Sequence, residues 1–125
     1  AKKRIPSWGV RGGMQIGCKV NLRGKKAMDF LDKALEANDR SLKAKNFDKQ
    51  GNFSFGVKEY IDIPGLKYDP EIGLLGFDVC VTMRKWGYRV KNRKRKPSRM
   101  PARHLITKED AIAFAKEKLN VQVAE

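Results

Sequence analysis

Lysine and arginine are the residues whose spacing in this sequence most clearly indicates chemistry. Ten of them fall between residues 84 and 104 with no acid among them, and eight more fall in residues 1–26, again with no acid. Positive charge at this density repels itself unless a polyanion neutralises it. The other ten Lys and Arg stand among all fourteen acids, so the two acid-free stretches predict binding of a phosphate backbone.

Catalytic and metal chemistry find no comparable pattern. Cys18, Cys80 and the single His104 stand too far apart in sequence for a zinc site. His104 also has no neighbouring nucleophile or carboxylate that could form a triad. The glycine-rich stretch 12–19 has Cys18 where a Walker loop needs lysine. We therefore expect no catalytic residue, no metal and no cofactor, and an RNA-modifying enzyme is disfavoured.

Length and composition predict one domain with a core of its own. The chain has 125 residues, 41% of them hydrophobic, and a formal net charge of +14. This size suits a single domain, and the hydrophobic content is too high for a disordered basic tail. The most apolar run, residues 72–77, is too short to span a bilayer. Two cysteines cannot form a disulfide scaffold, which favours a reducing, cytoplasmic location.

The elements that would position the basic residues follow from hydrophobic periodicity. Apolar residues alternate with polar ones in residues 16–23, 52–58, 77–83 and 86–91, as in half-buried strands. An apolar stripe at helical spacing lies between Gly24 and Asn38, and a second helix is expected to begin at the N-cap Thr107. The fold class predicted is α+β, a two-layer sandwich of a mostly antiparallel sheet with helices on one face and an open basic face.

The open face of that sheet is the predicted binding surface. The solvent-facing strand positions would carry basic and amide side chains: Lys19, Asn21, Arg23, Lys58, Arg89 and Lys91. Pro97 and Pro101 would stiffen residues 91–104 into an extended basic arm that follows a phosphate backbone. No expected helix has a basic face suited to a DNA major groove, so RNA is favoured over DNA.

Aromatic residues beside the bases raise the question of base stacking. Alternation places Trp86 and Tyr88 on the apolar face of their expected strand, which predicts core packing rather than stacking. Trp8 lies in a basic, glycine-flanked loop, and stacking on a nucleotide and packing on protein remain equally open for it.

Long ordered motifs then identify a family. They are Gly51–Glu59 (GNFSFGVKE), Tyr68–Gly73 (YDPEIG), Gly76–Val79 (GFDV), Ile16–Gly24 (IGCKVNLRG), and Arg103-His104 leading to Thr107–Ala111 (TKEDA). Together they resemble the family of ribosomal large-subunit protein five, the 5S rRNA-binding ribosomal proteins, in its archaeal form, which is close to the eukaryotic one. The resemblance runs from residue 1 to the C-terminal helix. Family members begin with a further helix and strand that this sequence lacks, and more often have Thr where Asn21 stands.

The resemblance implies a non-enzymatic structural protein of the large ribosomal subunit. Its partners would be 5S rRNA and adjacent large-subunit rRNA in the central protuberance, P-site tRNA, and neighbouring ribosomal proteins including one of the small-subunit head. A free-standing RNA-binding module or ribosome-assembly factor with the same basic face is the alternative. Residues 1–125 would form one RNA-binding domain, with residues 1–15 as a projecting basic loop and residues 91–104 as the arm.

The candidate site residues divide between two RNAs. The residues expected to bind rRNA are Lys19, Asn21, Arg23, Lys58, Arg89, Lys91, Arg93, Lys94, Arg95, Lys96, Arg99, Arg103 and His104. By position in the family, the residues expected to face tRNA are Lys2, Lys3, Arg4, Trp8 and Arg11.

Overall fold

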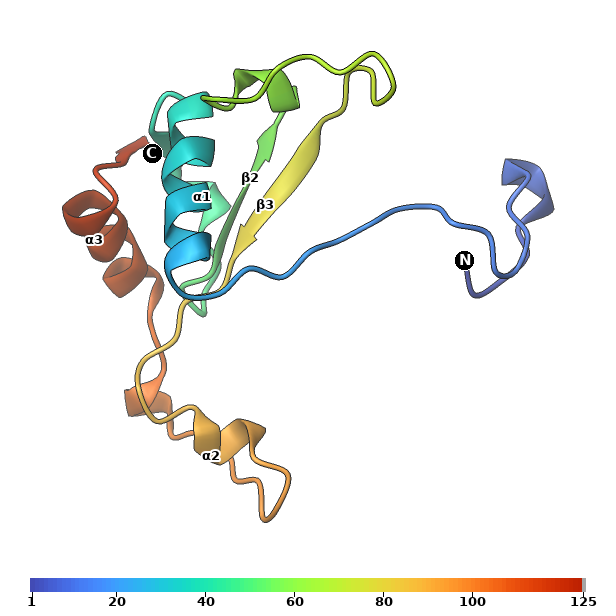
Figure 1. Ribbon diagram of the computed structural model, residues 1–125. Helices are drawn as coiled ribbons and strands as arrows, with labels where there is room; N and C mark the ends of the chain where they lie inside the picture. The colour runs from blue at the N-terminus through green and yellow to red at the C-terminus, as the bar shows by residue number, and fades with distance from the viewer. Residues whose placement is uncertain (125) are drawn as a thin grey trace.

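The computed structural model describes residues 1–124, and these combine helices with short strands (Figure 1). The α+β class is therefore confirmed. In chain order the elements are η1 (Pro6–Trp8), α1 (Lys25–Ala37), β1 (Ser41–Lys43), η2 (Ala44–Asn46), β2 (Phe53–Val57), η3 (Tyr60–Asp62), β3 (Phe77–Val81), α2 (Arg89–Asn92), η4 (Ala102–His104), α3 (Lys108–Lys118) and β4 (Gln122–Ala124), where η marks a turn of 3-10 helix.

Helix α1 forms where the apolar stripe predicted it. Leu31, Ala34 and Leu35 are buried along one face, whereas the charged residues Asp32 and Glu36 are exposed. An amphipathic stripe of this kind forms a stable helix only by packing on a core. The confirmed helix therefore fixes one wall of the hydrophobic core.

Strands β2 and β3 pair antiparallel and confirm two of the expected strands. Phe55 pairs with Val79, and Val57 with Phe77. Alternate residues of β2 are buried and exposed in turn, with Ser54 facing outward. The period of two thus turns the phenylalanines of β2 toward the core.

Strands β1 and β4 pair in parallel, and sequence reasoning did not find them. Each has only three residues, which is too short for periodicity to detect. Arg40 holds their ends together: its backbone oxygen accepts from the Gln122 amide at 2.8 Å, and its Nη1 donates to the Leu119 oxygen at 2.9 Å. The chain ends of α1 and α3 are thereby joined.

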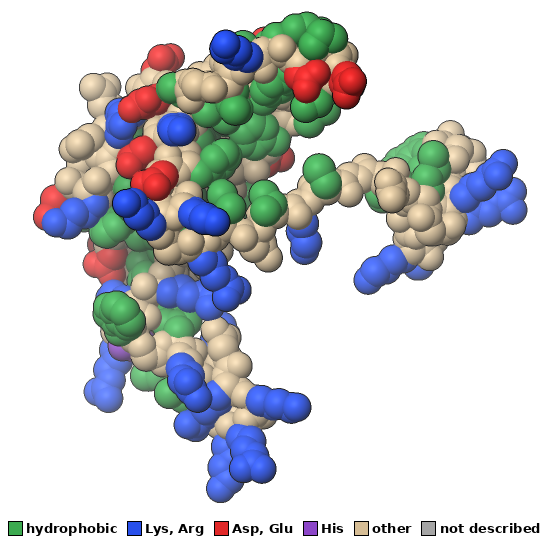
Figure 2. Space-filling model, in the orientation of Figure 1, with side chains coloured by type: hydrophobic (Ala, Val, Ile, Leu, Met, Phe, Trp, Pro, Cys, Tyr) green, Lys and Arg blue, Asp and Glu red, His purple; other side chains and the backbone are tan. Residues whose placement is uncertain are grey.

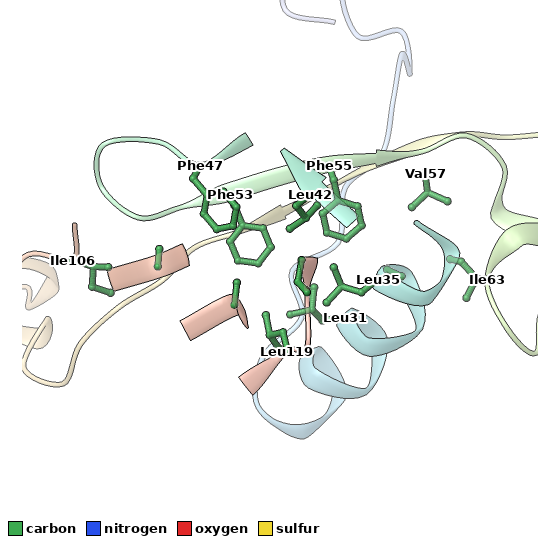
Figure 3. Close-up of a cluster of buried hydrophobic side chains, with 14 residues drawn as sticks. Leu31, Leu35, Leu42, Phe47, Phe53, Phe55, Val57, Ile63, Ile106 and Leu119 are labelled. Carbon is green, nitrogen blue, oxygen red and sulfur yellow. The ribbon is translucent and has the colours of Figure 1, made fainter. Parts of the chain in front are cut away.

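The core lies between the β2–β3 pair and the helices α1 and α3, with β1 completing it (Figure 3). Leu35, Leu42 and Leu119 are its largest fully buried side chains. Helices therefore cover the inner face of the β2–β3 pair, as expected. The single, mostly antiparallel sheet of a two-layer sandwich is not observed: within residues 1–124 there are two separate two-stranded sheets, one antiparallel and one parallel.

The strand expected at residues 16–23 is not formed. This segment runs as an unpaired coil from the N-terminal hairpin to α1 (Figure 1). Its expected apolar face is in solvent, with Ile16 68% and Val20 79% exposed. Alternation permits a strand, but a strand also needs a neighbour for its backbone groups, and no segment of residues 1–124 pairs with this one.

The strand expected at residues 86–91 is also wrong. The chain turns at Gly87, which has a φ of +95°, and enters the short helix α2. Glycine adopts this left-handed conformation readily, and it interrupts a strand. Trp86, expected in the core, is instead 97% exposed.

Candidate nucleic-acid interface

Residues 1–14 form a small hairpin that stands away from the body of the molecule (Figure 1). Ile5 and Val10 exchange backbone hydrogen bonds of 2.9 and 3.2 Å around η1, and the Gly13 amide donates to the Ala1 oxygen at 2.8 Å. Trp8 is 76% exposed at the tip. The residues predicted to face tRNA all lie in solvent on this hairpin: Lys2, Lys3, Arg4, Trp8 and Arg11.

Lys19, Asn21 and Arg23 lie on the connecting coil of residues 14–23 and are all exposed. They project from a single unpaired segment, so the sheet does not position them. The expectation that they share one open sheet face with Lys58 is wrong. Lys58 follows β2 directly and is exposed.

The open face of the β2–β3 pair is not basic. Its outward residues are Ser54 and Gly56 on β2 and Asp78 and Cys80 on β3, a set with one acid and no base. Because β3 runs from Phe77 to Val81 and Val57 pairs with Phe77, Lys58 lies at the end of the hairpin opposite the one that leads into residues 84–104.

The basic block, residues 84–104, projects from the other end of the body (Figures 1 and 2). All ten of its Lys and Arg side chains are exposed. Figure 2 shows lysine and arginine gathered on this segment and on the N-terminal hairpin, whereas the acids lie over the body. Arg89 and Lys91 lie on α2, Arg103 and His104 on η4, and the remaining predicted residues in the loop between them are Arg93, Lys94, Arg95, Lys96 and Arg99.

Specific hydrogen bonds hold the basic block in shape. The Ser98 amide donates to the Val90 oxygen at 3.1 Å, and Arg93 Nε donates to the Lys96 oxygen at 2.8 Å. At its base, Nε2 of His104 donates to the carbonyl oxygen of Trp86 at 2.6 Å. The block is thus a closed loop whose charged side chains radiate from a defined backbone.

A shallow open groove of about 520 Å³ lies within the basic block. Val90, Met100 and Pro101 supply its apolar lining. Arg99, Arg103 and His104 add donors that suit phosphate or base edges. Both types of surface that a nucleotide requires therefore meet in this groove.

Sequence reasoning missed the role of position 86. The signal was present, because Trp86 is followed directly by glycine inside a run of bases, and glycine at the centre of a short strand argues against that strand. Tyr88, by contrast, is partly covered, with the Arg84 guanidinium 5.9 Å from its ring centroid.

Among residues 1–124, no three His, Cys, Asp or Glu side chains gather in a way that could hold a metal ion. Within the same range, no helix is both long enough and apolar enough to cross a membrane.

Comparison with known proteins decides the family. The model of the C-terminus of the ribosomal protein uL5 family matches residues 15–114. The chain belongs to the uL5 family. Its relatives include large ribosomal subunit protein uL5 of Methanococcus vannielii, 52% identical over 98% of this chain and 70% of the relative. The uL5 protein of Sulfurisphaera tokodaii is 49% identical over 100% of this chain and 71% of the relative.

Membership of the uL5 family confirms several expectations at once. Proteins of this family are structural, non-enzymatic constituents of the large ribosomal subunit, and this chain is one of them, with the ribosomal, cytoplasmic location expected. The exposed basic hairpin and basic block are consistent with RNA binding by a uL5 protein.

Proposed function

We propose that the chain binds 5S rRNA and adjacent large-subunit rRNA in the central protuberance, chiefly through the basic block. The observation that carries this proposal is the display of ten exposed Lys and Arg, without an acid, on one hydrogen-bonded loop. Lys and Arg bind phosphates wherever they lie, but a fixed backbone also sets the register on folded RNA. Lys19, Asn21, Arg23 and Lys58 would add contacts from the coil and the body.

The N-terminal hairpin is proposed to contact P-site tRNA. Its bases flank η1, and the tip residue Trp8 is free to reach a nucleotide. The connecting coil separates it from the body, which supports contact with an RNA other than the one bound by the basic block. Residues 1–125 would thus act as one RNA-binding domain with two projecting regions.

The loop of residues 59–75 is proposed to bridge to a protein of the small-subunit head. It carries Glu59, Asp62, Asp69 and Glu71, all at least partly exposed. Exposed apolar side chains accompany them, including Tyr68 at 55% and Leu74 at 64%. Acids repel phosphates, so acidic and apolar residues together suit a basic protein better than RNA.

A salt titration of 5S rRNA binding tests the rRNA proposal. Each lysine or arginine bound to phosphate releases counterions, so we expect the dissociation constant to rise steeply with salt. Replacing Lys94, Arg95 and Lys96 together by Ala should weaken binding about tenfold or more and lower the slope of log K against log salt by about three.

Three bases outside the basic block provide the matched control. Lys33, Lys116 and Lys118 are exposed on α1 and α3, and their replacement by Ala removes the same net charge. Equal losses in the two triple variants would show that only total charge matters and would overturn the proposed interface. Binding that does not respond to salt would overturn it as well.

A further inference from the structure

Trp86 is the most exposed large hydrophobic residue of the described chain, at 97%. An indole carries about 150–250 Å² of surface whose burial would favour folding. Trp86 contributes nothing of this kind to the core described above. The side chain is therefore available in full to a partner.

The backbone that carries Trp86 is held in place. His104 Nε2 donates to its carbonyl oxygen at 2.6 Å, and a Cβ on Gly87 would lie 3.3 Å from that same ring nitrogen. Next to it in sequence, Lys85 Nζ lies 3.4 Å from Asp110 Oδ2 at the start of α3. A tryptophan on a fixed turn loses little backbone entropy on binding, which favours its use as a contact.

The surroundings of Trp86 indicate the chemistry of that partner. Arg84, Lys85 and Arg89 flank it in sequence, and the basic block contains no acid. The groove of about 520 Å³ begins at the next residue, Gly87, and offers apolar lining beside Arg99 and Arg103. A protein partner would have to be strongly acidic, whereas a nucleotide brings a flat aromatic face and a phosphate together.

We propose that Trp86 is a stacking platform for an unpaired RNA base, and that the adjacent groove receives the neighbouring nucleotide. This inference rests on the RNA binding proposed for the basic block and adds the class of element recognised there. Bases within a continuous duplex are stacked on each other and cannot stack on an indole, but loops and bulges present free bases. Trp86 thus selects unpaired nucleotides, while the surrounding bases bind phosphates of either form.

Two RNA probes with equal numbers of phosphates separate stacking from charge: a hairpin with an unpaired loop, and a blunt duplex. In the full chain, Trp86→Ala should weaken hairpin binding about 5- to 150-fold, the range of base–aromatic stacking. Duplex binding should be unchanged, and Trp86→Phe should keep most of the hairpin affinity. Because Trp86 is exposed, the Ala variant should unfold at the same urea concentration as the parent.

Fluorescence gives a second readout that reports on the indole itself. The chain has two tryptophans, so Trp8→Phe leaves Trp86 as the single emitter. We expect its fluorescence to be quenched by the hairpin RNA and to change little with the duplex. The reciprocal variant Trp86→Phe, with Trp8 alone, shows how much quenching arises away from this site.

The outcomes distinguish the two proposals. If Trp86→Ala binds the hairpin like the parent, or loses affinity equally for hairpin and duplex, stacking is overturned. In that case a loss of both affinities in the Lys94, Arg95 and Lys96 triple variant keeps the basic block as an RNA interface. If the triple variant binds both RNAs like the parent, RNA binding by the basic block itself is overturned.

Discussion

Gly51 shows how one residue joins two parts of the fold. Its φ of +75° lies in the left-handed region, and a Cβ there would lie 2.5 Å from Cγ2 of Ile106 and 3.1 Å from the Thr107 oxygen. The turn before it is closed by Asp48, whose Oδ1 accepts from the Gln50 amide at 2.6 Å. Glycine is therefore needed both for the conformation of the turn and for the close approach of the segment that begins α3.

Replacing Gly51 by Ala should lower the free energy of unfolding by about 2–4 kcal/mol. The left-handed conformation costs about 1–2 kcal/mol for a residue with a Cβ, and overpacking against Ile106 adds about 1–3 kcal/mol. Urea unfolding measures the change. Gly65→Ala is the matched control, because Gly65 has a φ of +89° but nothing within 4 Å of its Cβ position. Equal costs at the two sites would contradict the close approach.

At the scale of elements, the start of α3 connects the body to the basic block. Thr107 Oγ1 accepts from the Asp110 amide at 3.2 Å, and Asp110 Oδ2 accepts from the Thr107 amide at 3.3 Å, which forms a capping box. The backbone hydrogen bond from Thr107, followed by Lys85, holds the pKa of the Asp110 carboxyl below its ordinary value of 3.8. One carboxylate thus caps a helix and contacts a base of the basic block.

The pH dependence of stability should report this carboxylate. A pKa that is lower in the folded chain stabilises the fold above the unfolded value, and this contribution is lost as pH falls through the folded pKa. Asp110→Asn should therefore destabilise the chain at neutral pH and become equal to the parent in acid. Urea midpoints measured from about pH 6 to about pH 3 test this.

The exposed Asp29 supplies the control for that titration. Asp29 lies on α1 and accepts no hydrogen bond from a side chain or backbone group outside its helix among residues 1–124. Asp29→Asn should change stability little across the same pH range. A variant of Asp110 that runs parallel to the parent at every pH would show that its charged form does not stabilise the fold.

Elements that pack on the core are the ones that sequence periodicity predicted. The stripe around Leu31 and Leu35 and the alternation around Phe55 reflect burial, which the fold then supplies. Residues 16–23 have the same alternation but no neighbouring strand. Around Gly87, a single left-handed residue was enough to turn a short alternating run into a turn and helix. Local pattern cannot reveal whether a partner strand exists, and it does not distinguish strand from helix over six residues.

The candidate site was predictable in composition but not in placement. The acid-free stretches are visible in the sequence, and the structure keeps their bases in solvent. Their distribution over a hairpin, a coil and a projecting block depends on tertiary structure. Trp86 was placed in the core because alternation was extended through Gly87, and it is in fact exposed.

At the scale of the whole molecule, the two basic regions are separated by the coil of residues 14–23 (Figure 1). Such a segment reaches up to about 33 Å when fully extended. Exposed charges farther apart than the Debye length, about 10 Å at 0.1 M salt, are largely screened from each other. The hairpin and the basic block should therefore bind their RNAs independently.

Charge removal in each region tests that independence. In large subunits reconstituted with the full chain, Lys2, Lys3 and Arg4 replaced by Ala should weaken tRNA binding and leave retention of 5S rRNA unchanged. Replacement of Lys94, Arg95 and Lys96 should do the reverse. Sites without shared partners have additive free energies, so the sixfold variant should show the sum of the two losses for each RNA. Loss of both RNAs from either triple variant would mean that the two regions act as a single surface, joined through the coil that carries Lys19 and Arg23.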